Sequence, residues 1–311
     1  MNKISIIGAG MTGATTAHWL AERELADLVL VDVVEGMPQG KALDLLEAMP
    51  IIGRDVRISG ANDYTATKDS DIIIITAGLP RKPGMSRDDL LSANAEIVGT
   101  AATETLKHSP DAIYIVLTNP LDTMAYLTMK KTGLPRERVI GQAGILDSAR
   151  MRAFVAMETG VSVENIDCYV LGGHGDEMVP LTRLSNIAGI SLKEYLPADK
   201  LEAIVARTRK GGGEIVNLLK TGSAFYAPSA ACAQMAEAIL KNKHLIVPCA
   251  AYMDGEYGLE DMFFGVPVML GRTGMEKIIQ YKLDEDEKIM FDKSAAAVKE
   301  THEALKNLVK F

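Results

Sequence analysis

One histidine in this chain is placed where its side chain could do chemistry. His174 stands in the segment Gly172-Gly173-His174-Gly175-Asp176, directly after an apolar run over 167–171 that predicts a strand. The glycines would let a ligand approach the imidazole, which titrates near neutral pH and can take or give a hydroxyl proton. On this segment alone, a structural histidine is the alternative. The other histidines lie in helical or lysine-flanked contexts typical of a surface: His18, His108, His244 and His302.

A carboxylate and an arginine three residues apart could complete such a site. Asp147 and Arg150 lie in a helical pattern over 147–159, so their side chains share one helix face. A carboxylate can orient an imidazole, and a guanidinium fork can hold the carboxylate of a substrate. The same spacing also suits an ion pair within one helix, and the residues alone favour neither interpretation.

Further cations lie in the loop over 78–87. Arg81, Lys82 and Arg87 follow the apolar run 71–77, a predicted buried strand, although the whole chain has a net charge of −8. Ligands of open α/β sheets bind at the carboxyl ends of strands, where this loop would lie. A solvated basic loop is the simpler interpretation until other motifs are considered.

The first loop of the chain has the spacing of a phosphate-binding turn. Gly8, Gly10 and Gly13 fit G-x-G-x-x-G between a predicted strand over 3–7 and a helix that follows it. The glycines permit a tight turn, approach of the backbone to a pyrophosphate, and close packing of helix on strand. Free N–H groups at the start of that helix, around Met11 and Thr12, would bind the phosphates.

An acidic residue at the end of the second predicted strand distinguishes between the two nicotinamide dinucleotides. Asp32 lies 19 residues after Gly13. A carboxylate there can accept hydrogen bonds from ribose hydroxyls and would repel a 2′-phosphate. The spacing therefore predicts NAD rather than NADP as the cofactor.

The elements that must position these residues alternate between strand and helix patterns in the first half of the chain. This alternation implies βαβ units with right-handed crossovers. We therefore predict an α/β fold, a doubly wound parallel sheet of the Rossmann type over residues 1–143, with strand order 3-2-1-4-5-6. The predicted strands cover 3–7, 27–33, 56–60, 71–77, 112–118 and 138–143, and the predicted helices 11–23, 36–49, 88–108 and 121–132.

Residues 144–311 have the pattern of an α+β substrate or catalytic domain. No Gly/Ser-rich linker precedes it, so the two domains should pack tightly. The acidic start and basic end of its last helix suit the helix dipole. The predicted elements are a helical stretch over 199–240 interrupted at Gly211–Gly213 and at Pro228, strands over 245–251 and 266–270, and a last helix from 284–287 to Lys306 and Lys310.

Composition narrows the class of protein. Net acidity argues against a nucleic-acid binder, and no apolar run approaches the roughly 20 residues that span a bilayer. We expect a cytoplasmic protein, because the N-terminus lacks a signal-peptide pattern and the three cysteines are too widely spaced for a disulfide framework. We also expect no metal, since the cysteines form no zinc motif and His174, Asp176 and Glu177 are too close in sequence to converge on one ion.

Together these motifs resemble the lactate/malate dehydrogenase family. The glycine loop, the basic loop, Thr118-Asn119-Pro120, the run 146–150 and the run 173–176 occur in the order seen in that family, and the likeness covers essentially the whole chain. The resemblance implies an NAD-dependent oxidoreductase acting on a 2-hydroxy acid. It also implies a homodimer or homotetramer, with the segment 40–47 as a candidate for subunit pairing, although its apolar stripe can equally be core.

The resemblance implies a role for each matched residue. His174 would be the proton donor and acceptor, with Asp147 as its orienting partner. Arg150 would grip the C1 carboxylate of the substrate, Asn119 would bind the reactive oxygen, and Arg87 would polarise the carbonyl as the loop closes over the site. The expected cofactor-binding residues are Gly8, Gly10, Met11, Thr12, Gly13, Asp32, Asn94 and Asn119.

By the same resemblance, Arg81 is the residue expected to select the substrate within the family. This position is Arg in members that use malate and typically Gln in members that use lactate, so the resemblance points to the malate-oxidising, lactate-dehydrogenase-like branch and to the tricarboxylic acid cycle. A second substrate carboxylate requires a second cation, whereas pyruvate would leave Arg81 unpaired in a closed site. The implied reaction is reversible hydride transfer between (S)-malate and NAD⁺, giving oxaloacetate and NADH.

Two alternatives stay open, and a third is set aside. A lactate or other 2-hydroxy-acid dehydrogenase is the nearest alternative, since Arg81 is the only strong argument against it. An NAD-binding redox sensor without catalysis would need the glycine loop and Asp32 but not His174. Tyr126 and Lys130 match the Y-x-x-x-K pair of short-chain dehydrogenases, but that spacing is common in amphipathic helices and that family has a different glycine spacing.

Overall fold

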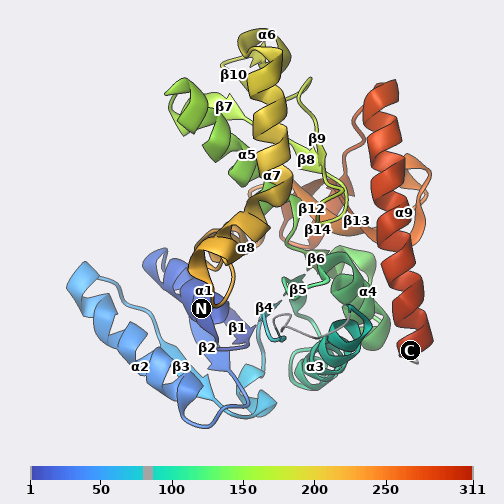
Figure 1. Cartoon of the computed structure of the whole chain (residues 1–311). Helices are drawn as coiled ribbons and strands as arrows, with labels where there is room; N and C mark the ends of the chain where they lie inside the picture. The colour runs from blue at the N-terminus through green and yellow to red at the C-terminus, as the bar shows by residue number, and fades with distance from the viewer. Residues whose placement is uncertain (1, 80–86, 310–311) are drawn as a thin grey trace.

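The computed structural model describes residues 2–79 and 87–309, and one large sheet runs through its centre (Figure 1). The strands of the first half are parallel and follow the order β3-β2-β1-β4-β5-β6, which confirms the predicted order. These strands are β1 (Lys3–Ile7), β2 (Asp27–Val31), β3 (Ile58–Ala61), β4 (Ile72–Ile75), β5 (Ile113–Val116) and β6 (Val139–Gly141).

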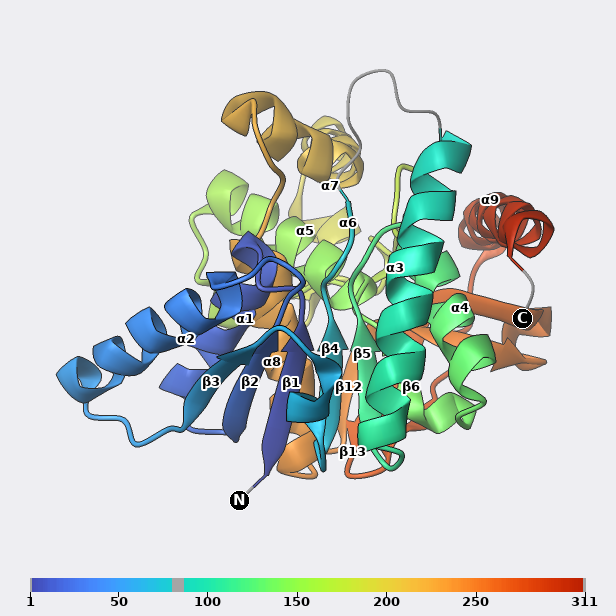
Figure 2. The same ribbon diagram turned by 90° about the horizontal axis from the view of Figure 1, so that it is seen from below.

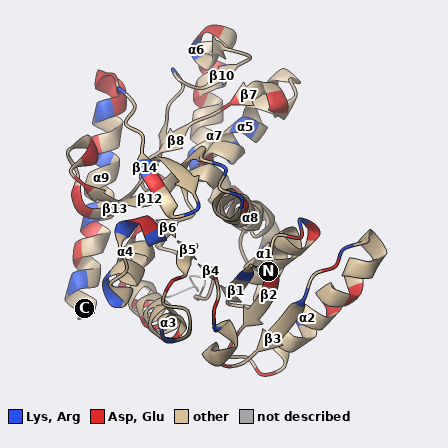
Figure 3. Cartoon of the chain, turned by 180° about the vertical axis from the view of Figure 1, so that it is seen from behind, with Lys and Arg blue, Asp and Glu red and all other residues tan. Residues whose placement is uncertain are grey.

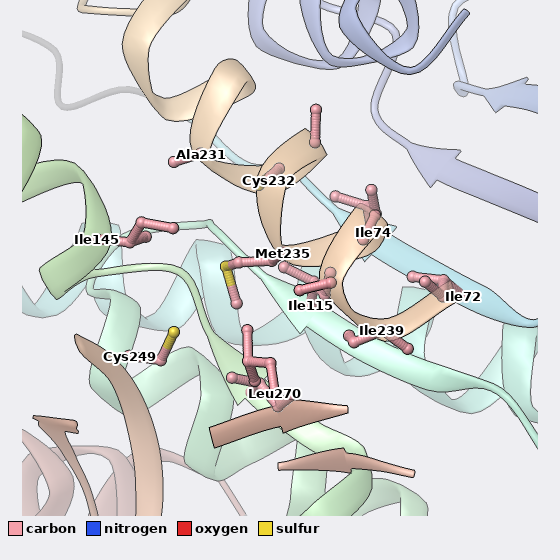
Figure 4. Packing of buried hydrophobic residues seen from close by; sticks show 14 of the residues in the cluster. Ile72, Ile74, Ile115, Ile145, Ala231, Cys232, Met235, Ile239, Cys249 and Leu270 are labelled. Carbon is pink, nitrogen blue, oxygen red and sulfur yellow. The ribbon is translucent and has the colours of Figure 1, made fainter. Parts of the chain in front are cut away.

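Helices cover both faces of this sheet (Figure 2). On β4, Ile72 and Ile74 pack in the cluster that includes α8, whereas Ile73 and Ile75 face α3 and α4, because successive side chains of a strand point to opposite faces (Figure 4). The helices are α1 (Met11–Glu22), α2 (Met37–Ala48), α3 (Arg87–His108), α4 (Leu121–Thr132) and α8 (Tyr226–Leu240).

The second half of the chain extends the same sheet, which the sequence analysis did not predict. β12 (Leu245–Asp254) pairs antiparallel with β6 through Ala250 and Gly141, and β13 (Glu260–Gly271) and β14 (Gly274–Ile278) follow it outward. The predicted domains therefore share a sheet of nine strands. Among the described residues, no helix is long and apolar enough to cross a membrane.

Smaller elements make up the rest of the second half. The predicted strand over 167–171 is two short strands in different sheets, and between them the N–H of Tyr169 donates to a side chain, Oγ of Ser185. The elements are α5 (Gly144–Thr159), β7 (Ile166–Asp167), β8 (Val170–Leu171), β9 (Val179–Pro180), β10 (Asn186–Ile187), β11 (Ile190–Ser191) and α6 (Leu192–Tyr195). Single-turn 3₁₀ helices are η1 (Met49–Ile52), η2 (Tyr64–Thr67), η3 (Arg136–Arg138), η4 (Val163–Asn165) and η5 (Glu256–Gly258).

The predicted helical stretch over 199–240 is interrupted at a different place. α7 (Ala198–Leu219) continues through Gly211–Gly213, and the break falls at 220–225, where Lys220 and Gly222 have positive φ. Pro228 lies in the first turn of α8, where its missing N–H removes no helical hydrogen bond. α7 stays helical through its three glycines because the packing of the helix outweighs the low helix propensity of glycine.

The last helix, α9 (Glu285–Leu308), begins as predicted in the acidic cluster. Asp284 and Glu287 form a capping box, and the helix carries interspersed acidic and basic residues (Figure 3). Lys310 lies outside the described residues. His302 is buried in the α9 interface with α4 rather than on the surface, and burial lowers its pKa to about 4.

Candidate active site

Three side chains from two segments meet in the second half of the chain. His174 follows β8, whereas Asp147 and Arg150 project from α5. Nδ1 of His174 lies 2.9 Å from Oδ2 of Asp147, and Nη1 of Arg150 donates to Oδ1 of the same carboxylate at 3.2 Å. Asp147 therefore forms the ion pair within its helix and also contacts the imidazole, so the two interpretations of this spacing are compatible.

Burial and charge act in opposite directions on His174. Burial disfavours the imidazolium, but the Asp147 carboxylate favours it, assisted by Asp122, so the pKa of His174 lies above its ordinary value. Arg150 opposes this effect more weakly. Because Asp147 accepts a hydrogen bond from Nδ1, Nε2 is the ring atom available to a substrate.

Other elements hold the backbone that carries His174. Each of three consecutive N–H groups donates to a different element, so the imidazole is fixed through the main chain as well as through Nδ1. The acceptors are the carbonyl of Gly265 in β13 for Gly172 (2.8 Å), Oγ of Ser294 in α9 for Gly173 (3.0 Å) and Oδ2 of Asp122 in α4 for His174 (3.0 Å).

Asp122 is a residue of this site that sequence reasoning missed. It is only 6% exposed, and burial raises the pKa of its carboxyl to about 6, although the N–H of His174 donates to it. In the sequence, Asp122 has the ordinary appearance of an acidic residue in the first turn of a helix.

One glycine of α7, Gly211, leaves room for the arginine of the site. A Cβ on Gly211 would lie 2.3 Å from Cδ and 2.6 Å from Nε of Arg150, whereas a Cβ on Gly213 would meet no atom within 4 Å. Gly211 thus allows α7 to pack directly on the Arg150 side chain. The two segments are distant in sequence, so composition alone did not reveal this contact.

The glycine loop has the form of a phosphate cradle. Gly8 has a φ of +101°, and a Cβ there would lie 2.7 Å from the backbone nitrogen of Ala77. A Cβ on Gly13 would overlap the carbonyl of Gly8, whereas one on Gly10 would meet nothing within 4 Å. Gly10 precedes α1 and offers no side-chain cap, so the first N–H groups of the helix are available to an anion.

Asp32 and a lysine brace this loop. The Asp32 carboxylate accepts hydrogen bonds from the N–H groups of Ala9 at 2.7 Å and Val34 at 3.0 Å. Lys41 from α2 donates to the carbonyl of Ala9 at 2.7 Å, a contact that sequence reasoning missed. Each Asp32 oxygen keeps a further lone pair for a ribose hydroxyl. Of the two helix-start residues, Met11 is exposed and Thr12 half-buried.

The two asparagines occupy different positions. Asn119 is exposed after β5 and is joined to Pro120 by a cis peptide bond. Asn94 is buried in α3, where its side-chain oxygen accepts from the N–H of Leu79 at 2.7 Å and its amide donates to the Asn119 carbonyl at 2.8 Å. The structure therefore places Asn94 as a brace between the two segments that end β4 and β5, and its predicted contact with the cofactor stays a prediction.

The basic loop falls mostly outside the described residues. Arg81 and Lys82 are among the residues not described, and Arg87 is described only as the first residue of α3. Their predicted substrate contacts therefore stay predictions. The described residues contain no group of three or more His, Cys, Asp or Glu side chains that could hold a metal ion.

Tyr126 and Lys130, the residues that match Y-x-x-x-K, belong to a polar cluster around the carboxylate of Asp261. The hydroxyl of Tyr126 and the ammonium of Lys130 both donate to Asp261 at the start of β13, at 3.1 and 2.9 Å. Lys306 from α9 donates to the same carboxylate at 3.2 Å. These contacts tie α4, β13 and α9 together.

Comparison with protein families matches both halves of the chain. Residues 2–141 match the lactate/malate dehydrogenase NAD-binding domain, and residues 145–309 match the lactate/malate dehydrogenase alpha/beta C-terminal domain. Malate dehydrogenase of Roseiflexus castenholzii is 57% identical over 98% of this chain and 99% of its own, and malate dehydrogenase of Desulforudis audaxviator is 58% identical over 96% of each chain.

Solved structures of both family branches share the fold. The apo malate dehydrogenase of Picrophilus torridus is 47% identical with a TM-score of 0.96, covering 99% of this chain and 98% of its own. A lactate dehydrogenase of Cryptosporidium parvum, complexed with lactic acid and NAD, is 39% identical with a TM-score of 0.95 over 98% of each chain. Likeness of fold alone therefore does not separate the two substrates.

Proposed function

Because the chain belongs to the lactate/malate dehydrogenase family, we propose that it is an NAD-dependent dehydrogenase that interconverts (S)-malate and oxaloacetate. The observation that carries the proposal is one buried carboxylate, Asp147, that contacts both an imidazole and a guanidinium. This arrangement supplies a proton acceptor beside a cation suited to a carboxylate. Relatives 55–58% identical to this chain are malate dehydrogenases, which favours malate over lactate.

NAD fits the residues present. The open cradle at Gly10 and the free N–H groups of α1 would hold the pyrophosphate, and Asp32 would hold the adenosine ribose. When bound, the nicotinamide accepts hydride from the substrate carbon or returns it.

His174 moves the proton of the reaction. In malate oxidation Nε2 takes the proton of the C2 hydroxyl, and in oxaloacetate reduction it gives the proton to the carbonyl oxygen. The Asp147 carboxylate stabilises the imidazolium formed in the first direction and keeps the ring oriented in both. The raised pKa of His174 favours the imidazolium that malate oxidation forms.

The remaining polar groups bind and orient the substrate. Arg150 would hold the C1 carboxylate, and Asn119 would donate to the reactive oxygen. Arg87 would polarise the carbonyl, and Arg81 would pair with the second carboxylate that distinguishes malate from lactate.

A comparison of substrates tests this proposal. NADH oxidation is measured with oxaloacetate, pyruvate and a branched 2-oxo acid at equal concentrations. We expect oxaloacetate to be reduced at least a hundredfold faster than pyruvate, since only oxaloacetate has a second carboxylate to pair with Arg81 while the first pairs with Arg150. Preference for pyruvate would favour the lactate dehydrogenase alternative, and NADH binding without turnover of any 2-oxo acid would favour the redox sensor.

We also propose a homodimer or homotetramer that works in the cytoplasm and serves the tricarboxylic acid cycle. On α2, Leu43 and Leu46 are exposed while Ala42 is buried, so part of the apolar stripe of 40–47 is core and part remains for subunit pairing. The three cysteines are unpaired and buried, as a reducing compartment favours. Sedimentation would establish the number of subunits.

A further inference from the structure

A second buried carboxylate lies against the segment that carries His174. Oδ2 of Asp122 accepts the backbone N–H of His174 at 3.0 Å. Oδ1 of Asp122 is also buried, and it has no hydrogen-bond partner among the described residues. A buried carboxylate oxygen without a partner is costly to the fold, so its presence beside the imidazole calls for an explanation.

The charges around the imidazole supply that explanation. Asp147 and Arg150 face His174 from α5, and Asp122 faces it from α4. β13 and α9 contribute only a carbonyl and a serine hydroxyl to its backbone. Among the described residues, these two carboxylates and one guanidinium leave one negative charge, which a protonated imidazole balances. Without Asp122, the neutral imidazole would already be the balanced state.

We propose that Asp122 is a positioning residue that sets the protonation equilibrium of His174, holding its backbone through Oδ2 and favouring the imidazolium with its charge. The inference rests on the proposed function, because it assigns His174 the proton transfer. Burial favours the neutral carboxyl and raises the pKa of Asp122 to about 6, while the charge of Asp122 in turn raises the pKa of His174. The two groups therefore titrate as a coupled pair.

The consequence is a defined effect on pH dependence. Oxaloacetate requires protonated His174, so its kcat/KM falls as pH rises through the pKa of that residue in the NADH complex. Malate requires the neutral ring, so its kcat/KM rises through the corresponding pKa in the NAD⁺ complex. Removing the Asp122 charge should move both midpoints to lower pH by about one unit. A merely structural defect would lower both rates and leave both midpoints in place.

The experiment uses Asp122→Asn, which keeps an oxygen for the His174 N–H and removes the charge. The matched control is Glu177→Gln, which removes an exposed carboxylate three residues after His174 that pairs with Lys293 at 2.9 Å. Profiles of kcat/KM are recorded from pH 5 to 10 in both directions. We expect Asp122→Asn alone to shift both midpoints downward. Midpoints equal to those of the wild type, or an equal shift in Glu177→Gln, would overturn the inference.

A second measurement does not need turnover. In protein labelled with ¹⁵N-histidine, the ring signals of His174, assigned by their loss in His174→Asn, follow its titration directly. In the wild type these signals should show two steps, the lower one from Asp122, and a single step would overturn the inference even if Asp122→Asn fails to fold. A wild type without oxaloacetate reduction would refute the proposed function, while this titration would still decide the role of Asp122.

Discussion

Replacing Gly211 by alanine should damage substrate binding through Arg150. The new Cβ would lie 2.3 Å from Cδ of Arg150, whereas ordinary contacts begin at 3.4 Å, so the side chain must move by about 1 Å. A displacement of that size in a group that orients the substrate costs about a hundredfold in kcat/KM, or about 2.7 kcal/mol. Because Arg150 holds substrate and transition state alike, most of the loss should appear as a higher KM for oxaloacetate.

Gly213→Ala is the matched control, two residues further along the same helix. Its Cβ would meet no atom within 4 Å, so it should keep the wild-type KM and stabilise α7 by about 0.5–1 kcal/mol through helix propensity. Steady-state NADH oxidation at varied oxaloacetate concentration, with urea unfolding of both variants, separates the two effects. A wild-type KM in Gly211→Ala, or an equal loss in Gly213→Ala, would refute the assigned contact.

Two further predictions concern the loop cation and the polar cluster around Asp261. In Arg81→Gln the second carboxylate of oxaloacetate loses its partner, so kcat/KM for oxaloacetate should fall by a factor equivalent to about 2–5 kcal/mol. Unchanged kinetics would contradict the assignment of malate as the substrate. Burial raises the pKa of Asp261, but hydrogen bonds from Lys130 and Lys306 outweigh it and lower this pKa to about 2. The ionised carboxylate therefore stabilises the fold above about pH 4, the pKa of Asp in the unfolded chain, and this stabilisation is lost as pH falls through about 2. Asp261→Asn should therefore lower the free energy of unfolding at pH 7 by no more than about 1 kcal/mol, since the carboxylate is 48% exposed, and urea titrations should show the difference narrowing below pH 4.

Much of the fold was predictable because its signals are local. The four isoleucines of β4 predicted a strand buried on both faces, and the glycine spacing with Asp32 predicted the phosphate loop and its cofactor. The acidic cluster over 284–287 likewise indicated the start of α9. In each case the residues that determine the element lie within a few positions of one another, or at a spacing characteristic of the fold.

The features that were not predicted depend on contacts between distant segments. Gly211 has the appearance of a helix breaker, but its role depends on Arg150, which lies 61 positions earlier. The hydrogen bond from His174 to Asp122 spans 52 positions, and no periodicity in either segment indicates it. The pairing of β12 with β6 likewise joins the two predicted domains, and no local sequence pattern in either strand indicates which strand it pairs with.

Replacement of His174 by asparagine separates the proposed proton transfer from cofactor binding. Asparagine removes the titrating ring, while the cofactor cradle at Gly10 and Asp32 is unchanged. We expect His174→Asn to bind NADH with wild-type affinity, measured by cofactor fluorescence, and to reduce oxaloacetate about 10²–10⁴ times more slowly than the wild type. Wild-type turnover in this variant would contradict the assignment of proton transfer to His174.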